Sequence, residues 1–155
     1  MTEENMKRFI LIISVLILVF LTACDYEAAR SYDINLTGKQ EVHTVNSSAS
    51  GTAKVDLVKV KQGDYTANIL KIRGTYKNLS GPATAAHWHG PALEGEDGPI
   101  VFKLKLVEGS TPGSGTFSGE KDLTDNQLHF YLAHYSYINI HTAKYKKGEI
   151  RGQIQ

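Results

Sequence analysis

The chain has 155 residues, with 17 lysine and arginine residues against 16 aspartate and glutamate residues, and a formal net charge of +1. This length allows one domain, and the near-neutral charge gives no electrostatic case for nucleic-acid binding. The single cysteine and both methionines lie within the first 24 residues, so the rest of the chain contains no sulfur. A metal site in that part would have to use nitrogen and oxygen ligands.

The first 23 residues have the order of a secretory signal peptide. Two basic residues, Lys7 and Arg8, precede an apolar run over residues 9–20, and small residues follow at positions 22 and 23. This order is typical of a segment that directs export and is then removed. The apolar run is too short to cross a bilayer as a helix, which takes about 20 residues.

Leu21, Thr22, Ala23 and Cys24 together resemble the lipobox of bacterial lipoproteins, whose cysteine receives a diacylglycerol group. The resemblance implies that Cys24 is lipidated and that the protein is extracytoplasmic, anchored to a bacterial cell membrane. Each buried methylene of an acyl chain contributes about 0.8 kcal/mol to such an anchor. The alternative is a soluble secreted protein with an incidental cysteine. We expect the polar residues 24–31 to form a short tether.

Apolar and polar residues alternate along most of the chain after the tether. Such alternation indicates strands with one buried face, and it recurs over residues 33–36, 54–59, 65–76 and 100–107. Glycine–proline pairs, which mark turns, separate the later stretches. They stand at positions 81–82, 90–91 and 98–99. Short strands of this kind suit a sandwich or a barrel, and we predict an all-β fold, an antiparallel, Greek-key-like β-sandwich.

One segment has helical spacing instead. Thr124 and Gln127 fit a capping box, in which the side chain of each residue bonds the backbone of the other. Leu128 and Tyr131 then recur at the spacing of one helical face. We predict one short helix near residues 125–134.

The last two predicted strands have clear faces because their residues alternate strictly. Four isoleucines share the apolar faces and must belong to the core: Ile138, Ile140, Ile150 and Ile154. The opposite faces carry Tyr137, Asn139 and His141 on one strand and Glu149, Arg151 and Gln153 on the other.

Five segments together resemble the CHRD domain, which is named for the animal morphogen antagonist chordin and is common in bacterial secreted proteins. They are residues 36–42, 86–91, 98–101, 138–143 and 148–154. The resemblance covers residues 32–155 and implies a β-sandwich, with no enzymatic activity general to the family. The chain departs from the family pattern at His43 and Thr44, where prolines are usual, and at residues 134–136, where a glycine is frequent.

Three histidines are the candidate metal ligands. His87 and His89 stand two residues apart on a predicted strand and therefore share a face, whereas Ala86 and Trp88 take the face toward the core. His141 also points away from its core neighbours. If the two strands lie close together, the three imidazoles could bind Zn²⁺ or Cu²⁺, ions that suit nitrogen ligands. The residues that could support these ligands are Asn139, Glu149 and Arg151.

Two alternatives stay open for these histidines. Each ring could instead bond a loop carbonyl or the carboxylate of Glu149 and have a purely structural role. A His-x-His pair on a strand also occurs in copper–zinc superoxide dismutase, and this analogy suggests a redox metalloprotein as the alternative function. The other histidines stand alone, and we expect them on the surface: His43, His129 and His134.

The expected function is that of a cell-envelope lipoprotein whose CHRD domain is a non-enzymatic binding or structural module. Its expected partners are the membrane, through the lipid anchor, and a protein or small ligand that the sequence does not name. Zinc or copper is an expected cofactor only under the alternative in which the three histidines bind a metal ion. Catalysis is less favoured because the chain after Cys24 has neither a free thiol nor a G-x-S-x-G nucleophile motif.

Overall fold

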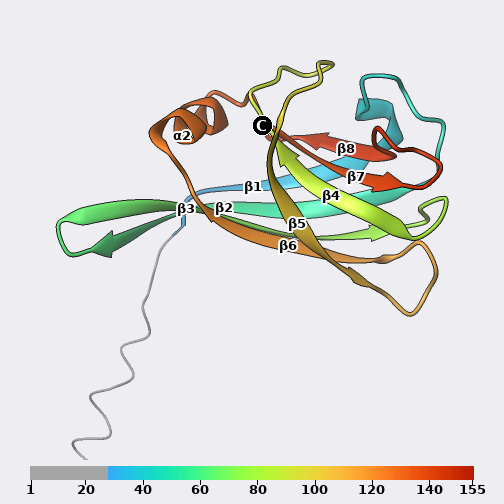
Figure 1. Ribbon diagram of the computed structural model, residues 1–155, viewed down its shortest axis with the longest axis horizontal. Coiled ribbons are helices and arrows are strands. Elements are labelled where there is room, and N and C mark those ends of the chain that lie inside the picture. The colour runs from blue at the N-terminus through green and yellow to red at the C-terminus, as the bar shows by residue number, and fades with distance from the viewer. Residues whose placement is uncertain (1–27) are drawn as a thin grey trace, which may run out of the picture.

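The computed structural model describes residues 28–155, so the predicted signal peptide and Cys24 lie outside the described residues. Within this part of the chain no helix is long and apolar enough to span a bilayer. The elements, in chain order (Figure 1), are β1 (Ala28–Thr37), the 3₁₀ helix η1 (Gly38–Gln40), β2 (Ser50–Gln62), β3 (Tyr65–Lys77), β4 (Ala83–His89), β5 (Ile100–Glu108), β6 (Gly115–Asp122), α2 (Asp125–Leu132), β7 (Tyr137–Thr142) and β8 (Ile150–Gln153). Part of the segment expected to be a tether, residues 28–31, therefore belongs to β1.

The strands form one closed antiparallel barrel, in the order β1-β2-β3-β6-β5-β4-β7-β8. The predicted β-sandwich is therefore wrong, although the all-β class is correct. The barrel closes where β8 pairs with β1, at Thr37 and Arg151. Alternation with a period of two is the same in a sandwich and in a barrel, so the sequence pattern could not separate them.

A side chain completes the seam between β1 and β8. Only one register pair joins these strands, but the amide of Gln40 bridges them beside it. Its Nε2 donates to the carbonyl of Asn35 on β1 at 2.8 Å, and its Oε1 accepts from the backbone N–H of Gln153 on β8 at 3.3 Å. Gln40 therefore acts where a backbone ladder would otherwise continue.

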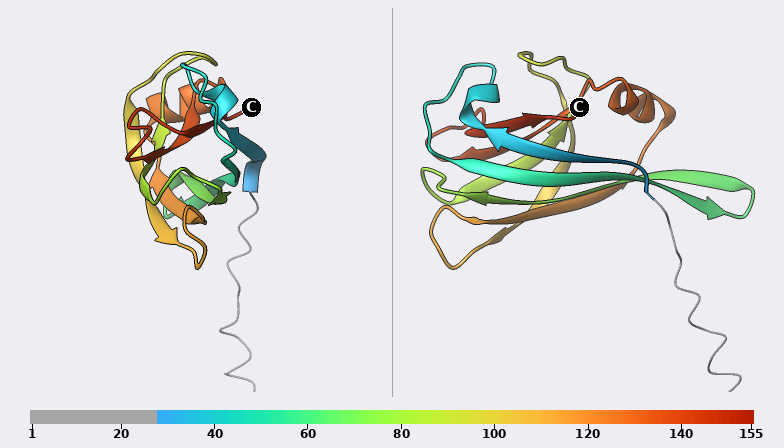
Figure 2. Two further views of the ribbon diagram at one scale, coloured as in Figure 1. Left: turned by 90° about the vertical axis from the view of Figure 1, so that its right-hand side faces the viewer. Right: turned by 180° about the vertical axis from the view of Figure 1, so that it is seen from behind.

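Two crossover connections bring distant segments together. After β3 the chain crosses to β4, returns through β5 to β6, which pairs with β3, and then crosses again through α2 to β7. As a result β7 pairs with β4, about fifty residues away in sequence, over positions from Ala83 to His89. Figures 1 and 2 show α2 at the same end of the barrel as the β2–β3 hairpin, which extends beyond the other strands.

The apolar core fills the barrel. The four isoleucines predicted to be buried are fully so, and Trp88 lies among them with no exposed surface. The short helix is confirmed and spans Asp125–Leu132, with both bonds of the capping box between Thr124 and Gln127. It packs onto the core through Phe130 and Tyr131, whose rings lie 5.5 and 6.5 Å from that of Trp88.

Candidate metal centre

A layer of buried polar side chains lies on the outside of the barrel, over strands β5, β4, β7 and β8. Register pairing lines up four outward-facing residues across these strands, the exposed Lys103 and the buried His87, Asn139 and Arg151. Their sequence neighbours belong to the core, so they point outward, yet the last three are at most 8% exposed. Loops cover them: Arg151 donates to the carbonyls of Leu93 and Glu96, and Asn139 donates to that of Lys147. The candidate ligands come together in this layer.

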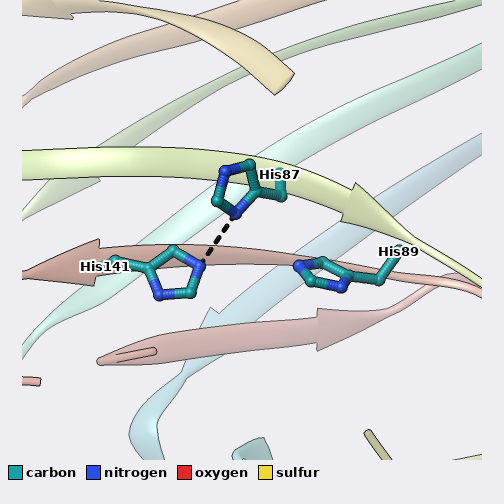
Figure 3. A group of neighbouring side chains, drawn as sticks. All are labelled: His87, His89 and His141. Carbon is teal, nitrogen blue, oxygen red and sulfur yellow. Dashed lines mark hydrogen bonds between the residues drawn. The ribbon is translucent and has the colours of Figure 1, made fainter. Parts of the chain in front are cut away.

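Three histidine side chains converge within it (Figure 3). Nδ1 of His87 lies 3.0 Å from Nε2 of His141. One ligand atom from each of His87, His89 and His141 lies within 4.8 Å of the other two. His87 faces Asn139 across the β4–β7 ladder, while Ala85 faces His141, so the two rings meet on a diagonal of neighbouring strands. The structure thus brings together all three histidines singled out in the sequence.

The hydrogen bonds of two rings show which nitrogen is free. Nδ1 of His89 lies 2.8 Å from the carbonyl oxygen of Gly98, and Nδ1 of His141 lies 3.0 Å from that of Lys146. A carbonyl can only accept, so both Nδ1 atoms carry the proton and both Nε2 atoms keep a lone pair. Nε2 of His89 is buried and makes no hydrogen bond. A buried acceptor without a donor fits a site that receives a cation.

Asn139 adds an oxygen to this set of acceptors. Its Nδ2 donates to the carbonyl of Lys147 at 3.3 Å, which directs Oδ1 toward Nε2 of His141 at 3.0 Å. Two lone pairs at this distance repel each other unless a proton or a metal ion lies between them. Burial lowers the pKa of His141 and thus opposes a second proton on this ring. The arrangement therefore fits a metal ion better than a proton.

Burial also keeps the other two histidines neutral. It lowers the pKa of His87 to about 4, with further lowering from His141, His89 and Lys103. Burial is the main cause of the lowered pKa of His89 as well. Neutral imidazole is the form that binds metals, so at pH 7 none of these rings would have to lose a proton before it binds a metal ion.

The distances fit a metal after a small adjustment. Zn–N bonds are about 2.0–2.1 Å, so two nitrogens on one tetrahedral ion lie about 3.3 Å apart and can never exceed about 4.2 Å. The 3.0 Å between His87 and His141 is close to this spacing. The full spread of 4.8 Å is wider, so one ring would have to move inward. The ring of His89 is the outlying one, at 5.5 Å from that of His87 compared with 4.8 Å for His141.

The three predicted supporting residues have different positions. Asn139 contacts His141 directly, and Arg151 reaches His89 through the ring of Tyr137. Glu149 does not contact the histidines: its carboxylate accepts from Ser47, Ser80 and Thr142. Burial alone would raise the pKa of Glu149, but these hydrogen bonds lower it overall.

The three remaining histidines were expected on the surface, and one of them is only partly exposed. His43 and His129 are exposed as expected, but His134 is half-buried, with Nδ1 3.2 Å from the carbonyl of Ile154.

Two buried residues near the histidines, Glu41 and Tyr137, were not assigned a role from the sequence. Glu41 is buried, and burial raises its pKa to about 7, with opposite contributions from Arg151 and Asp97. The outward position of Tyr137 on its strand was the one signal that placed it beside the histidines.

Residues 32–154 match the family model of the CHRD domain. The chain belongs to the CHRD domain family. No curated protein and no solved structure matches it. Within this CHRD domain three of the five segments that carry the resemblance meet on one side of the barrel: residues 86–91 supply His87 and His89, residues 138–143 supply His141, and residues 148–154 supply Arg151.

Proposed function

We propose that this CHRD domain is an extracytoplasmic, lipid-anchored binding module that holds a Zn²⁺ or Cu²⁺ ion through His87, His89 and His141. The observation that supports the metal is the convergence of the three rings, with lone pairs facing a shared space and no donor for Nε2 of His89. Three neutral imidazoles are a common ligand set for both ions.

Metal binding is tested by titrating the purified Cys24→Ser protein with Zn²⁺ and Cu²⁺ near neutral pH in a calorimeter. We expect one ion per chain, and His141→Ala should weaken binding at least 10-fold. His129→Ala is the matched control, because His129 is exposed on α2 and should not affect uptake. An absence of uptake by the parent protein would rule out the metal function and leave a binding or structural module without metal.

The donor set also suits copper, which makes the redox alternative testable with the same protein. A superoxide dismutase assay on the copper-loaded protein should show activity that His87→Ala removes. If the copper-loaded protein has no more activity than an equal amount of free copper, the centre has a binding or structural role and not a redox role.

The lipid anchor rests on the sequence alone, because Cys24 lies outside the described residues. We expect the expressed protein to carry the mass of a diacylated cysteine and to partition into the detergent phase of a detergent–water mixture. Cys24→Ser should remove both properties. Identical mass and partitioning of the two proteins, allowing for the substitution itself, would contradict the lipoprotein assignment.

A further inference from the structure

Three side chains form a stacked column that begins at His89. The rings of His89 and Tyr137 are parallel, with an angle of 4° between their planes and 4.6 Å between their centroids. The guanidinium carbon of Arg151 lies 3.5 Å from the centroid of the same tyrosine ring. His89 is on β4, Tyr137 on β7 and Arg151 on β8, and β7 lies between the other two strands. The histidine and the arginine therefore cover opposite faces of Tyr137.

Both ends of this column bond the same loop, residues 90–98. At the arginine end, Nη1 donates to the carbonyl of Glu96 at 2.7 Å and Nη2 donates to that of Leu93 at 3.1 Å. At the histidine end, Nδ1 of His89 donates to the carbonyl of Gly98. The backbone N–H of Gly98 in turn donates to Oη of Tyr137 at 3.2 Å. The loop and the column thus form a closed ring of contacts.

The other two candidate ligands are held independently of this loop. His87 and His141 contact each other directly, and Nδ1 of His141 bonds the carbonyl of Lys146 in the β7–β8 connection. His89 is the ligand whose ring lies farther away, and it is the one that would have to move inward. A change in loop 90–98 would consequently affect one ligand and spare two.

We infer that loop 90–98, acting through Tyr137 and Arg151, sets whether the centre binds its metal with two histidines or with three. This inference rests on the metal function proposed above. Tyr137 and Arg151 are positioning residues, because they act on the metal only through His89. By linkage, a metal ion bound to His89 also restrains the loop, since coupling between two sites is reciprocal.

The test measures Zn²⁺ affinity in a double-mutant cycle of the Cys24→Ser protein. Tyr137→Leu removes the stacked ring and should weaken binding about 10–100-fold, the usual effect of losing a group that orients a metal ligand. Tyr137→Phe keeps the ring, so its Zn²⁺ affinity should fall much less. Because the column acts through His89, adding Tyr137→Leu to His89→Ala should weaken binding no further. If Tyr137→Leu weakens Zn²⁺ binding by the same factor with and without His89→Ala, the inference is overturned while the metal function stands.

A second variant and a second measurement guard against misfolding of the Tyr137 variants. Arg151→Lys keeps the charge but cannot bond two carbonyls in a fixed fork, so it should also weaken Zn²⁺ binding only when His89 is present. Amide hydrogen exchange of Ala92, Glu96 and Gly98 should slow when Zn²⁺ is added to the parent protein and not when it is added to His89→Ala. Equal slowing in both proteins would contradict the coupling. No Zn²⁺ uptake at all would overturn the proposed function and this inference together.

Discussion

Neighbouring residues of one strand are buried on opposite sides of the sheet, some inside the barrel and some beneath the loops outside it. On β4, Trp88 is fully buried inside the barrel, while His87 and His89 are 8% and 6% exposed on its outer side, under loops. The alternation of residues predicted these faces correctly, because side chains of a strand point to opposite sides in turn. It could not predict that the outer face is buried, since the covering loops have no period to detect.

The isoleucines of the barrel interior allow a direct test of the assigned faces. Ile140 has no exposed surface, so Ile140→Ala removes three buried carbons and should lower the free energy of unfolding by about 2–5 kcal/mol. Denaturant titration measures the change. Ile100→Ala is the matched control, because Ile100 is 52% exposed and its loss should cost less than about 1 kcal/mol. Similar losses for both variants would mean that the faces are assigned wrongly.

The lowered pKa values of the histidines predict how stability of the metal-free protein changes with pH. The unfolded chain takes up protons at these rings below about pH 6.5, whereas His87 in the folded protein does so only near pH 4. The free energy of unfolding should therefore fall as the pH falls through this range. Glu41 opposes this trend: burial raises its pKa from 4.5 to about 7, so its contribution grows as the pH falls through 7.

His87→Gln should consequently lose less stability than the parent protein between pH 7 and pH 4. Denaturant titrations at several pH values measure this difference, and His129→Gln on the surface of α2 should behave like the parent. A His87→Gln protein with the pH dependence of the parent would show that this ring takes up its proton normally in the folded state.

At the scale of single elements, the turn after β1 explains one of the segments that resemble the CHRD domain. Gly38 begins η1, and a side chain there would collide with the backbone oxygen of Val45. Two residues later Gln40 bridges β1 and β8, and Glu41 then enters the polar layer. Sequence reasoning placed this segment in the domain but assigned it no function, because its partner strand lies at the other end of the chain.

The bridge made by Gln40 predicts a local weakness at the seam. Gln40→Ala removes both hydrogen bonds and leaves the N–H of Gln153 without its partner, so unfolding should become easier by about 1–3 kcal/mol. Amide exchange of Gln153 should speed up more than exchange elsewhere in β7 and β8. Lys39→Ala, an exposed neighbour in the same turn, is the control and should change neither quantity. Uniform exchange across the seam in Gln40→Ala would show that the bridge has no energetic role.

The helix and the barrel differ in how far their determinants extend along the chain. The capping box that begins α2 joins residues three positions apart, so a short window was enough to predict the helix. Closure of the barrel depends on Thr37 meeting Arg151, more than a hundred residues away. The candidate metal centre lies between these cases: the three histidines and their faces could be predicted, but the pairing of β4 with β7 and the carbonyls that orient the rings could not.

For the whole molecule, closure predicts the effect of removing the last strand. Deleting residues 150–155 takes away β8 and exposes the edges of β1 and β7, which pair with it. Unpaired edges associate readily with other chains, so the truncated protein should form oligomers or aggregates on a size-exclusion column with light scattering. Deleting Gln155 alone, which is exposed and follows β8, should leave the elution volume and the light-scattering mass of the parent protein unchanged. A monomeric truncated protein would show that closure is not what keeps these edges apart.

The position of the closing pair also has a consequence for biogenesis. If the chain is exported as we propose, its N-terminal part leaves the translocation channel first, so β1 would reach the outside long before β8 does. Strands β1, β2 and β3 can pair with one another early, but β1 keeps one bare edge until the last few residues are released. Distant pairings of this kind make folding slow. This domain would therefore spend most of its emergence as an open sheet. During that interval a chaperone outside the membrane would have an unpaired strand edge to bind.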